Sequence, residues 1–347
     1  MNPSSTPLLS VENLRVGFAT EAGVVQAVDG VSFDLRPGEV LAIVGESGSG
    51  KSVTAQTIIG LTRSKNSRIE GSVKLDDQEL IDASDAEMRR LRGERIGMVF
   101  QDPMTSFNPV YRIGSQIVEA IRAHRDDVSR ADARARVVEL FESVGIPNAE
   151  SRVDDYPHEF SGGMRQRAMI AMALALEPEV LIADEPTTAL DVTVQAQILA
   201  LLEGLNRERN LATILITHDL GVVAEVADRV LVMYAGRVVE QGTLDEIFYD
   251  PQHPYTWGLL GSLTRLDRPR PKRLPQISGS PPSLLALPDG CSFRPRCPHE
   301  FAKCTELPPL DAKLTDAPRH CDRCWLSPQE KRRKREVAGQ IGLEAPA

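Results

Sequence analysis

No apolar run in this 347-residue chain approaches the roughly 18 residues that a membrane-spanning helix requires. Residues 1–7 likewise have neither the basic start nor the apolar core of a secretory signal. We therefore expect the chain to stay in the cytoplasm without a transmembrane segment of its own, so that any membrane contact goes through a partner.

The chain also lacks an excess of positive charge. Its formal net charge is −9 at pH 7, whereas a general nucleic-acid binder needs more Lys and Arg than Asp and Glu to neutralise phosphates. Basic clusters at residues 265–273 and 331–335 are interpreted as solvated linker and tail, with a lipid or nucleic-acid patch as the alternative. We predict no nucleic-acid partner.

Cysteine is absent from residues 1–290, and all five cysteines follow that stretch. In a cytosolic chain such clustering points to a metal site rather than to disulfides. The candidate ligands are Cys291, Cys297, Cys304 and Cys324, with Cys321 as the spare thiol or an alternative fourth ligand. Four thiolates satisfy a tetrahedral Zn²⁺ or a 4Fe-4S cluster. Zinc usually favours paired C-x₂-C knuckles, and only Cys321 with Cys324 offers one, so we favour the cluster, with zinc or no metal as alternatives.

What the sequence does contain is a phosphate-binding pattern, G-x-x-x-x-G-K-S/T. An apolar run at residues 40–44 leads in, and a helix-like segment at residues 53–61 leads out. The glycines let backbone N–H groups and the positive end of the following helix converge on a β-phosphate. The lysine adds charge toward the β/γ-phosphates, and the last hydroxyl serves Mg²⁺. The predicted nucleotide-binding residues are Gly45, Glu46, Ser47, Gly48, Ser49, Gly50, Lys51 and Ser52.

The order of elements predicts an α/β fold. Residues 8–44 read as β-rich, residues 102–177 as helical, and residues 180–185 as a buried parallel strand ending in two acids. We predict a P-loop NTPase core with a parallel sheet, an antiparallel β subdomain, a helical subdomain insertion and a cysteine-containing C-terminal extension. The expected domains are a nucleotide-binding domain at 7–260 with its helical subdomain at about 102–177, the extension at 261–330, and a basic, then flexible tail at 331–347.

Further motifs follow the phosphate loop. They are Gln101 after an apolar strand, Ser161-Gly162-Gly163 at a helix start, Asp184-Glu185 at a strand end, Asp191 shortly after, and His218 after the apolar residues 214–216. In this order and spacing they resemble the nucleotide-binding subunits of ABC transporters over residues 8–245.

The resemblance implies a role in ATP hydrolysis for several of these residues. Asp184 would hold Mg²⁺ through water, together with Ser52 and Gln101, and Gln101 would also sense the attacking water. Glu185 would polarise that water as general base, an effect worth about 10² to 10⁴ in rate. His218 would contact the γ-phosphate; the alternative is a satisfied structural histidine.

A second anion site is implied at Ser161, Gly162 and Gly163. In the resembled family this Ser cap and glycine pair bind the γ-phosphate held by a facing subunit. The chain reads Phe-Ser-Gly-Gly-Met where many relatives carry Leu-Ser-Gly-Gly-Gln, a departure that keeps the Ser and both glycines. Two such domains sandwich two nucleotides, so a second ABC ATPase subunit, identical or related, is expected. Asp191 belongs to the same implied set. Independently of the resemblance, Phe18 is a candidate platform for stacking an adenine ring, or else a core aromatic.

Three stretches narrow the resemblance: residues 101–109, 156–160 and 253–256. With the cysteine-containing tail they look like the oligopeptide/dipeptide permease ATPase subfamily, and this likeness also favours the iron-sulfur cluster. The subfamily implies a peripheral subunit at the cytoplasmic face of the inner membrane, with two membrane permeases, an extracytoplasmic solute-binding protein and a second ATPase as partners. Phe107, Val110 and Tyr111 would line part of the groove for a permease helix, or else belong to the helical core.

We therefore predict an enzyme, the ATPase subunit of an ABC importer that powers uptake of di- or oligopeptides. Another cargo, such as nickel or an oligosaccharide, is an alternative because the ATPase does not touch the cargo. A soluble ABC ATPase acting on nucleic acid is a rival that the acidic charge and the single ATPase unit disfavour. A non-catalytic ATP-binding partner is disfavoured by the presence of both Glu185 and His218.

Overall fold

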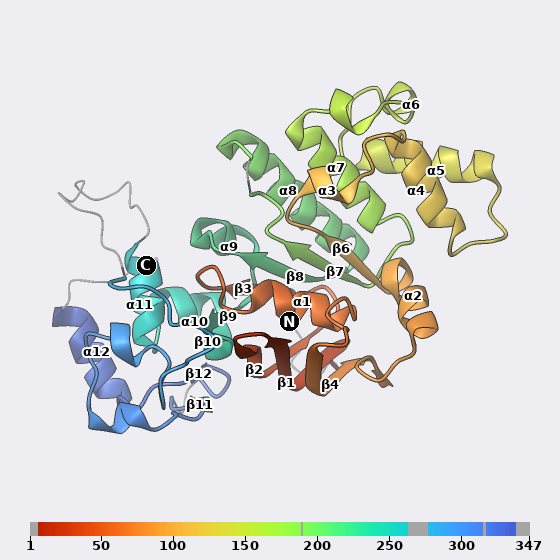
Figure 1. Ribbon diagram of the computed structural model, residues 1–347. Helices are drawn as coiled ribbons and strands as arrows, with labels where there is room; N and C mark the ends of the chain where they lie inside the picture. The colour runs from red at the N-terminus through yellow and green to blue at the C-terminus, as the bar shows by residue number, and fades with distance from the viewer. Residues whose placement is uncertain (1–5, 189, 263–276, 315–316, 338–347) are drawn as a thin grey trace. The chain divides into compact units, whose positions relative to one another are not determined.

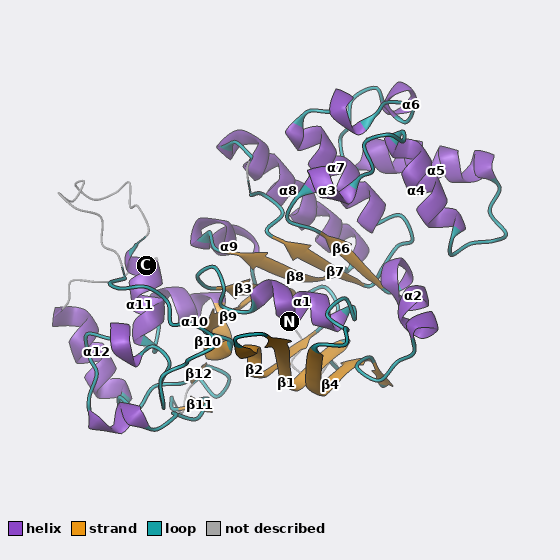
Figure 2. Cartoon of the chain, in the orientation of Figure 1, coloured by secondary structure: helices purple, strands orange, loops and turns teal. Residues whose placement is uncertain are grey.

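The computed structural model of the chain describes residues 6–188, 190–262, 277–314 and 317–337 (Figure 1). The chain divides into two compact units. The first comprises Met1–Leu8, Leu35–Val40 and Asp82–Ile216, and the second comprises Leu9–Asp34, Leu41–Ile81 and Thr217–Ala347. Each unit contains both helices and strands (Figure 2), so the predicted α/β class is confirmed. Within the described ranges, no helix is both long and apolar enough to cross a membrane.

The first unit contains a parallel sheet. Its strands lie in the order β8 (Ala212–Thr217), β7 (Val180–Asp184) and β6 (Ile96–Val99), and both pairings are parallel. Every residue of β7 is buried, which is typical of a strand covered on both faces. Asp184, the last residue of β7, therefore lies at the carboxyl edge of this sheet.

A run of helices lies between β6 and β7. They are α3 (Pro103–Ser106), α4 (Ile113–Arg122), α5 (Arg130–Ser143), α6 (Ala149–Arg152), the 3₁₀ turn η1 (Pro157–Glu159) and α7 (Gly162–Ala173), with α2 (Asp85–Glu94) before β6 and α8 (Val192–Arg209) after β7. The helices pack through buried apolar side chains, and the rings of Phe141 and Phe160 meet edge-on with centroids 6.2 Å apart. A side-chain cap fixes the start of several of these helices, as Ser129 does for α5.

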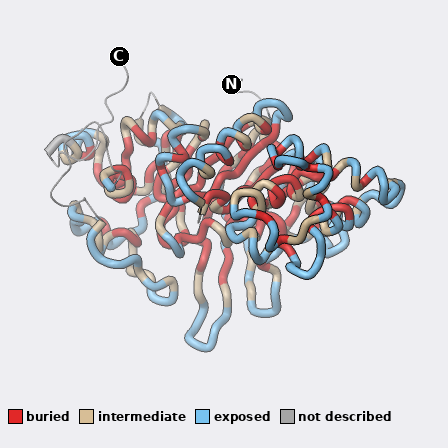
Figure 3. The backbone as a smooth tube through the Cα atoms, turned by 90° about the horizontal axis from the view of Figure 1, so that it is seen from above, coloured by how far each residue is buried: buried red, intermediate tan, exposed pale blue. Residues whose placement is uncertain are grey.

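The second unit contains two sheets. The antiparallel sheet has the order β2 (Gly23–Leu35), β1 (Leu9–Thr20), β4 (Ser67–Leu75) and β5 (Gln78–Glu79). The other has the order β11 (Asp311–Ala312), β12 (Cys321–Asp322), β10 (Arg237–Thr243), β9 (Arg229–Tyr234) and β3 (Val40–Val44), with β9 and β3 parallel. The helices are α1 (Lys51–Ile58), α9 (Leu220–Val226), α10 (Leu244–Tyr249), α11 (Pro254–Gly261), α12 (Pro328–Val337) and the 3₁₀ turns η2 (Arg294–Arg296) and η3 (Ala302–Thr305). Figure 3 shows buried residues along the inner stretches of the chain and exposed residues at the tips of the projecting loops.

Buried polar groups attach the C-terminal extension to the hairpin β9–β10. The carboxylate of Glu240 on β10 is fully buried and accepts hydrogen bonds from the backbone N–H groups of Gln252 and His253. It also lies 2.8 Å from Nε2 of His320 in the extension. Burial alone would lower the pKa of His320, but the hydrogen bond and charge of Glu240 outweigh burial and raise it.

A buried ion pair holds α12, so Lys331 is not part of a solvated tail as the sequence predicted. Nζ of Lys331 lies 2.6 Å from Oδ1 of Asp322, and the two side chains are 0% and 1% exposed. Nζ of Lys313 approaches the same oxygen at 3.0 Å. A buried pair adds little stability relative to an apolar pair, but breaking it is costly because one charge is left without its partner.

Replacing Lys331 with Met should lower the free energy of unfolding by about 3 kcal/mol, because Asp322 then loses its shorter ion pair. Urea unfolding followed by tryptophan fluorescence measures this change, since both tryptophans of the chain, Trp257 and Trp325, lie in the second unit. Arg332→Met, at an exposed position of the same helix, is the matched control and should cost less than about 0.5 kcal/mol. Equal costs for the two variants would contradict the buried pair.

Candidate functional site

The predicted phosphate loop lies between β3 and α1, packed against backbone. Gly45 and Gly50 have φ values of 151° and 100°. A Cβ on Gly45 would lie 2.2 Å from the carbonyl oxygen of Met233, and a Cβ on Gly50 would lie 2.4 Å from that of Ala27. Only glycine fits at both positions. The N–H of Gly236, in the turn between β9 and β10, donates to the carbonyl of Ser49 at 3.0 Å.

The groups around this loop suit a phosphate. Lys51 begins α1 and is 5% exposed, and its ammonium donates to the carbonyl oxygens of Gly45 at 2.8 Å and Glu46 at 3.1 Å. The hydroxyl of Ser49 is buried without a hydrogen-bond partner among the described residues. Ser52 is half-buried in the first turn of α1, while Ser47 and Gly48 are exposed. A helix start, a buried cation and an unpaired hydroxyl are the donors that a nucleotide phosphate requires.

The predicted acids end β7 in the first unit. Asp184 is 3% exposed, whereas Glu185 is half-buried. Glu185 has a φ of 47°, an uncommon left-handed conformation for a residue with a Cβ, and its N–H donates to the carbonyl of Ile216 at 2.9 Å. Its Oε2 accepts hydrogen bonds from Nε2 of Gln101 at 3.0 Å and from the hydroxyl of Thr188 at 2.9 Å. The structure thus brings Gln101 and Glu185 together and fixes the carboxylate.

Two other predicted residues of this unit are helix caps. The hydroxyl of Ser161 accepts from the N–H of Met164 at 3.3 Å and caps α7, and Asp191 accepts from the N–H of Val194 at 3.0 Å and caps α8. A Cβ on Gly163 would lie only 2.7 Å from Cγ1 of Val194, so this glycine is needed for packing. Around Gly162 a Cβ would meet nothing closer than 3.8 Å.

The remaining predicted residues lie in the second unit. His218 follows β8 directly and is exposed. Phe18 lies near the end of β1 and is half-buried, so its side chain is neither fully in the core nor fully in solvent.

Two contacts of these residues were not predicted from the sequence. Thr188 follows Glu185 by three residues and donates a hydrogen bond to its carboxylate. A hydroxyl side chain this close in sequence to the predicted base could have indicated the contact. The hydroxyl of Tyr255 accepts from the N–H of Glu46 at 2.8 Å, across 209 residues of sequence. Burial raises the pKa of Tyr255, which keeps this hydroxyl neutral. No sequence pattern near Tyr255 or Glu46 predicts this contact.

Four cysteines of the extension line one pocket. These are Cys291, Cys297, Cys304 and Cys324, the predicted ligands, whereas Cys321 lies on β12 outside it. All five are free thiols. Burial raises the pKa of Cys297 to about 12 and that of Cys324 to about 11, so both are neutral at pH 7 unless a cation stabilises the thiolates.

The predicted cysteine ligands line one pocket, but no metal-binding group is found among the described residues. The shared pocket agrees with four thiols facing one place. However, the described part of the chain contains no group of three or more His, Cys, Asp or Glu side chains arranged to hold a metal ion.

Comparison with known proteins gives consistent matches. Residues 28–188 match the family described as ABC transporter, and residues 239–304 match the oligopeptide/dipeptide transporter C-terminal region. The chain is 53% identical over 323 residues to the dipeptide transport ATP-binding protein DppD of Bacillus subtilis, covering 93% of this chain and 95% of that protein. It is 54% identical over 305 residues to the oligopeptide transport ATP-binding protein OppD of Salmonella typhimurium, covering 88% and 90%.

Solved structures agree with the fold. The dimeric post-hydrolysis structure of the ATP-binding cassette MJ0796 with ADP and Pi is similar with a TM-score of 0.62 and 28% identity, covering 68% of this chain and 98% of that one. The structure of cbiO1 from Clostridium perfringens, part of the ABC transporter complex cbiONQ, gives a TM-score of 0.59 and 32% identity, covering 70% and 91%.

Two loop glycines should respond differently to alanine. Gly45→Ala places its methyl group against the carbonyl of Met233 and should cost more than about 3 kcal/mol of stability. Gly48→Ala, with no atom within 4 Å, should cost only about 1 to 2 kcal/mol for its left-handed backbone. Thermal unfolding of both variants tests this order, and a Gly48 variant at least as destabilised as the Gly45 variant would contradict it.

Proposed function

We propose that this chain, which belongs to the ABC transporter family, is the ATP-hydrolysing subunit of an importer that drives uptake of di- or oligopeptides through membrane permeases. The observation that carries the proposal is the extent of the likeness. Relatives described as dipeptide and oligopeptide transport ATP-binding proteins match 93% and 88% of the chain. The likeness therefore includes the C-terminal extension and not only the nucleotide-binding motifs.

In the proposed mechanism, Mg-ATP binds at the phosphate loop. Lys51 and the start of α1 would hold the β- and γ-phosphates, and Ser52, Gln101 and Asp184 would hold Mg²⁺, partly through water. The packed glycines and the buried ammonium of Lys51 support this assignment. The magnesium ion would supply charge stabilisation at the transferring phosphoryl group.

Glu185 is proposed as the general base. Its carboxylate is held by two hydrogen-bond donors, Gln101 and Thr188, so its orientation is fixed before water is bound. A base that must face one water molecule needs such fixed geometry. His218, exposed after β8, is proposed to contact the γ-phosphate.

The start of α7 is proposed to serve the nucleotide of a second, facing ATPase subunit, identical or related. Ser161 and Gly162 are exposed, so the start of α7 is accessible to a ligand. The solved MJ0796 cassettes are described as dimeric. Phe18 and Asp191 complete the proposed nucleotide-binding residues.

A peripheral place at the cytoplasmic face of the inner membrane follows from the proposed importer, with two permeases and an extracytoplasmic solute-binding protein as partners. Val110 and Tyr111, which are 69% and 59% exposed, are the proposed contact for a permease helix. Phe107 is 2% exposed and belongs to the core of its unit, which was the alternative for that residue.

The cysteine pocket is proposed to hold a 4Fe-4S cluster through Cys291, Cys297, Cys304 and Cys324. The shared pocket supports this choice. The spacing also favours a cluster over zinc, because zinc usually takes paired C-x₂-C knuckles and only Cys321 with Cys324 offers one. When bound, the cluster would add a one-electron redox centre and four metal–thiolate bonds; ATP hydrolysis would not pass through it.

Glu185→Gln should bind ATP normally and hydrolyse it about 10²- to 10⁴-fold more slowly, because it keeps the shape but loses the base. Phosphate release by the assembled transporter measures the rate, and Glu208→Gln at an exposed position of α8 is the matched control. Lys51→Ala should instead weaken ATP binding. Wild-type turnover by the Glu185 variant would show that another residue is the base.

Anaerobic purification of the full chain, followed by iron, sulfide and zinc analysis, tests the cluster. We expect about four irons and four sulfides per chain, with visible absorbance. Cys297→Ser should lose the iron, whereas Cys321→Ser, outside the pocket, should keep it. A colourless protein with one zinc per chain would rule the cluster out.

A further inference from the structure

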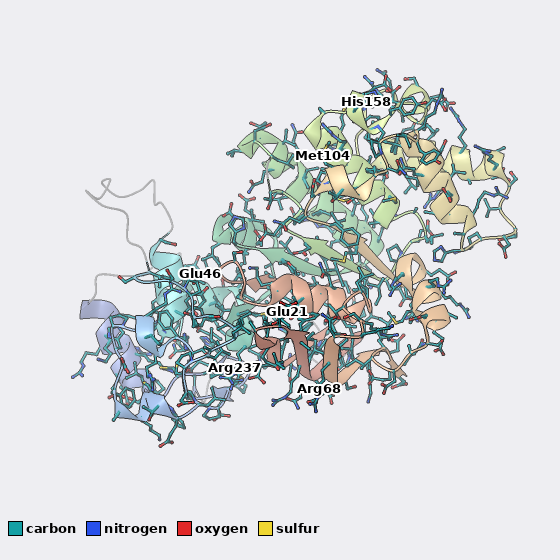
Figure 4. All side chains as sticks on the ribbon, in the orientation of Figure 1. Glu21, Glu46, Arg68, Met104, His158 and Arg237 are labelled. Carbon is teal, nitrogen blue, oxygen red and sulfur yellow. The ribbon has the colours of Figure 1, made fainter. Side chains whose placement is uncertain are left out.

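We infer that Arg296, in the C-terminal extension, is a positioning residue of the phosphate loop that acts through Glu46. The inference rests on the proposed function, because it requires the loop to bind ATP. Arg296 ends the turn η2, directly before Cys297. Glu46, labelled in Figure 4, is the second residue of the loop and precedes Arg296 by 250 residues.

The contact is a bidentate ion pair. Nη1 and Nη2 of Arg296 donate to Oε2 and Oε1 of Glu46 at 2.6 and 3.0 Å. Two parallel N–H···O bonds fix direction as well as distance, which a lysine ammonium does not do. The side chain of Arg296 is only 5% exposed, and that of Glu46 is 28% exposed.

The guanidinium of Arg296 is held independently of Glu46. Its Nε donates to the carbonyl of Ser278 at 2.9 Å, and Nη1 also donates to the hydroxyl of Tyr234 at 3.2 Å. The guanidinium carbon lies 5.8 Å from the centre of the Tyr234 ring. The guanidinium of Arg296 is therefore oriented by its own neighbours, and it gives Glu46 of the loop a partner in a fixed position.

Glu46 is bonded through three of its groups. Its carboxylate meets Arg296, its N–H donates to the hydroxyl of Tyr255 at 2.8 Å, and its carbonyl accepts from Nζ of Lys51 at 3.1 Å. The residue that Arg296 fixes thus supplies one of the carbonyl oxygens that orient the lysine ammonium. A shift of Glu46 would move both the start of the loop and an acceptor of Lys51.

Removing Arg296 and removing the charge of Glu46 should affect folding differently. Without Arg296, the partly exposed carboxylate of Glu46 is reached by water, so the chain should fold with a less ordered loop. Without the charge of Glu46, an almost buried guanidinium is left uncompensated, which costs folding stability. Arg296→Gln is therefore the cleaner variant. A less ordered loop has to be fixed when ATP binds, and this cost weakens binding.

Calorimetric titration of the purified full-length chain with Mg-ATP tests the inference. Arg296→Gln should raise the Kd by about two- to thirtyfold. Arg296→Lys, which keeps the charge but loses the fork, should lie between it and the wild type. In a Glu46→Gln background, Arg296→Gln should raise the Kd by a much smaller factor, because the two residues act through one contact.

Arg335→Gln is the matched control. Arg335, in helix α12, forms another ion pair of the second unit, with Asp250 at the end of α10, and the two side chains are 10% and 39% exposed. Arg335→Gln should lower the unfolding temperature about as much as Arg296→Gln does, without changing the Kd for Mg-ATP. An unchanged Kd in Arg296→Gln, or an equal rise in Arg335→Gln, would overturn the inference while leaving the ATPase proposal in place. A wild-type chain that does not bind Mg-ATP, or a Lys51→Ala variant that binds it as tightly as the wild type, would overturn both.

Discussion

The second unit depends on backbone-to-backbone packing between the phosphate loop and the hairpin β9–β10. The Cα of Gly45 faces the carbonyl of Met233 with no space for a Cβ, and the N–H of Gly236 bonds the loop at Ser49. The hairpin reaches this position through a tight turn in which Ala235 and Gly236 both have positive φ, 48° and 82°. The shape of the loop is therefore set by a strand pair that follows it by about 180 residues in the chain, and not by the loop sequence alone.

The hairpin β9–β10 also contacts the C-terminal extension. Glu240 on β10 accepts from the N–H of His253, and Nδ1 of His253 accepts from the N–H of Tyr255 at 3.1 Å. Tyr255 in turn accepts from the N–H of Glu46, and its ring lies 4.6 Å from that of Tyr234. Glu240 also lies 2.8 Å from Nε2 of His320 in the extension, so this one buried carboxylate supports both the extension and the tyrosine that contacts the loop.

The local motifs were readable from the sequence because each one is a short run with fixed spacing. The glycine loop before Lys51 and the acids after an apolar strand could be placed at a helix start and a sheet edge without tertiary information. Ser161 and Asp191 show the limit of such patterns, since each is also a sufficient helix cap. A cap and an anion site use the same residue types, so sequence alone does not separate the two roles.

The extension was harder to predict because its stability does not come from apolar periodicity. Its described helices and turns are short, and buried polar pairs such as Asp322 with Lys331 hold them. Such pairs join residues through the fold, as Arg296 and Glu46 do across 250 residues, and leave no local spacing to detect.

The contact between the extension and the loop has a thermodynamic consequence in both directions. If docking of Arg296 makes ATP binding tighter by some factor, then bound ATP must favour the docked extension by the same factor. The partly exposed carboxylate of Glu46 limits that factor, because water screens the pair when it opens. Under the proposed function, the extension would therefore adjust nucleotide affinity without controlling it, and the glycine packing under Gly45 and the donors around Lys51 would supply the larger part of phosphate binding.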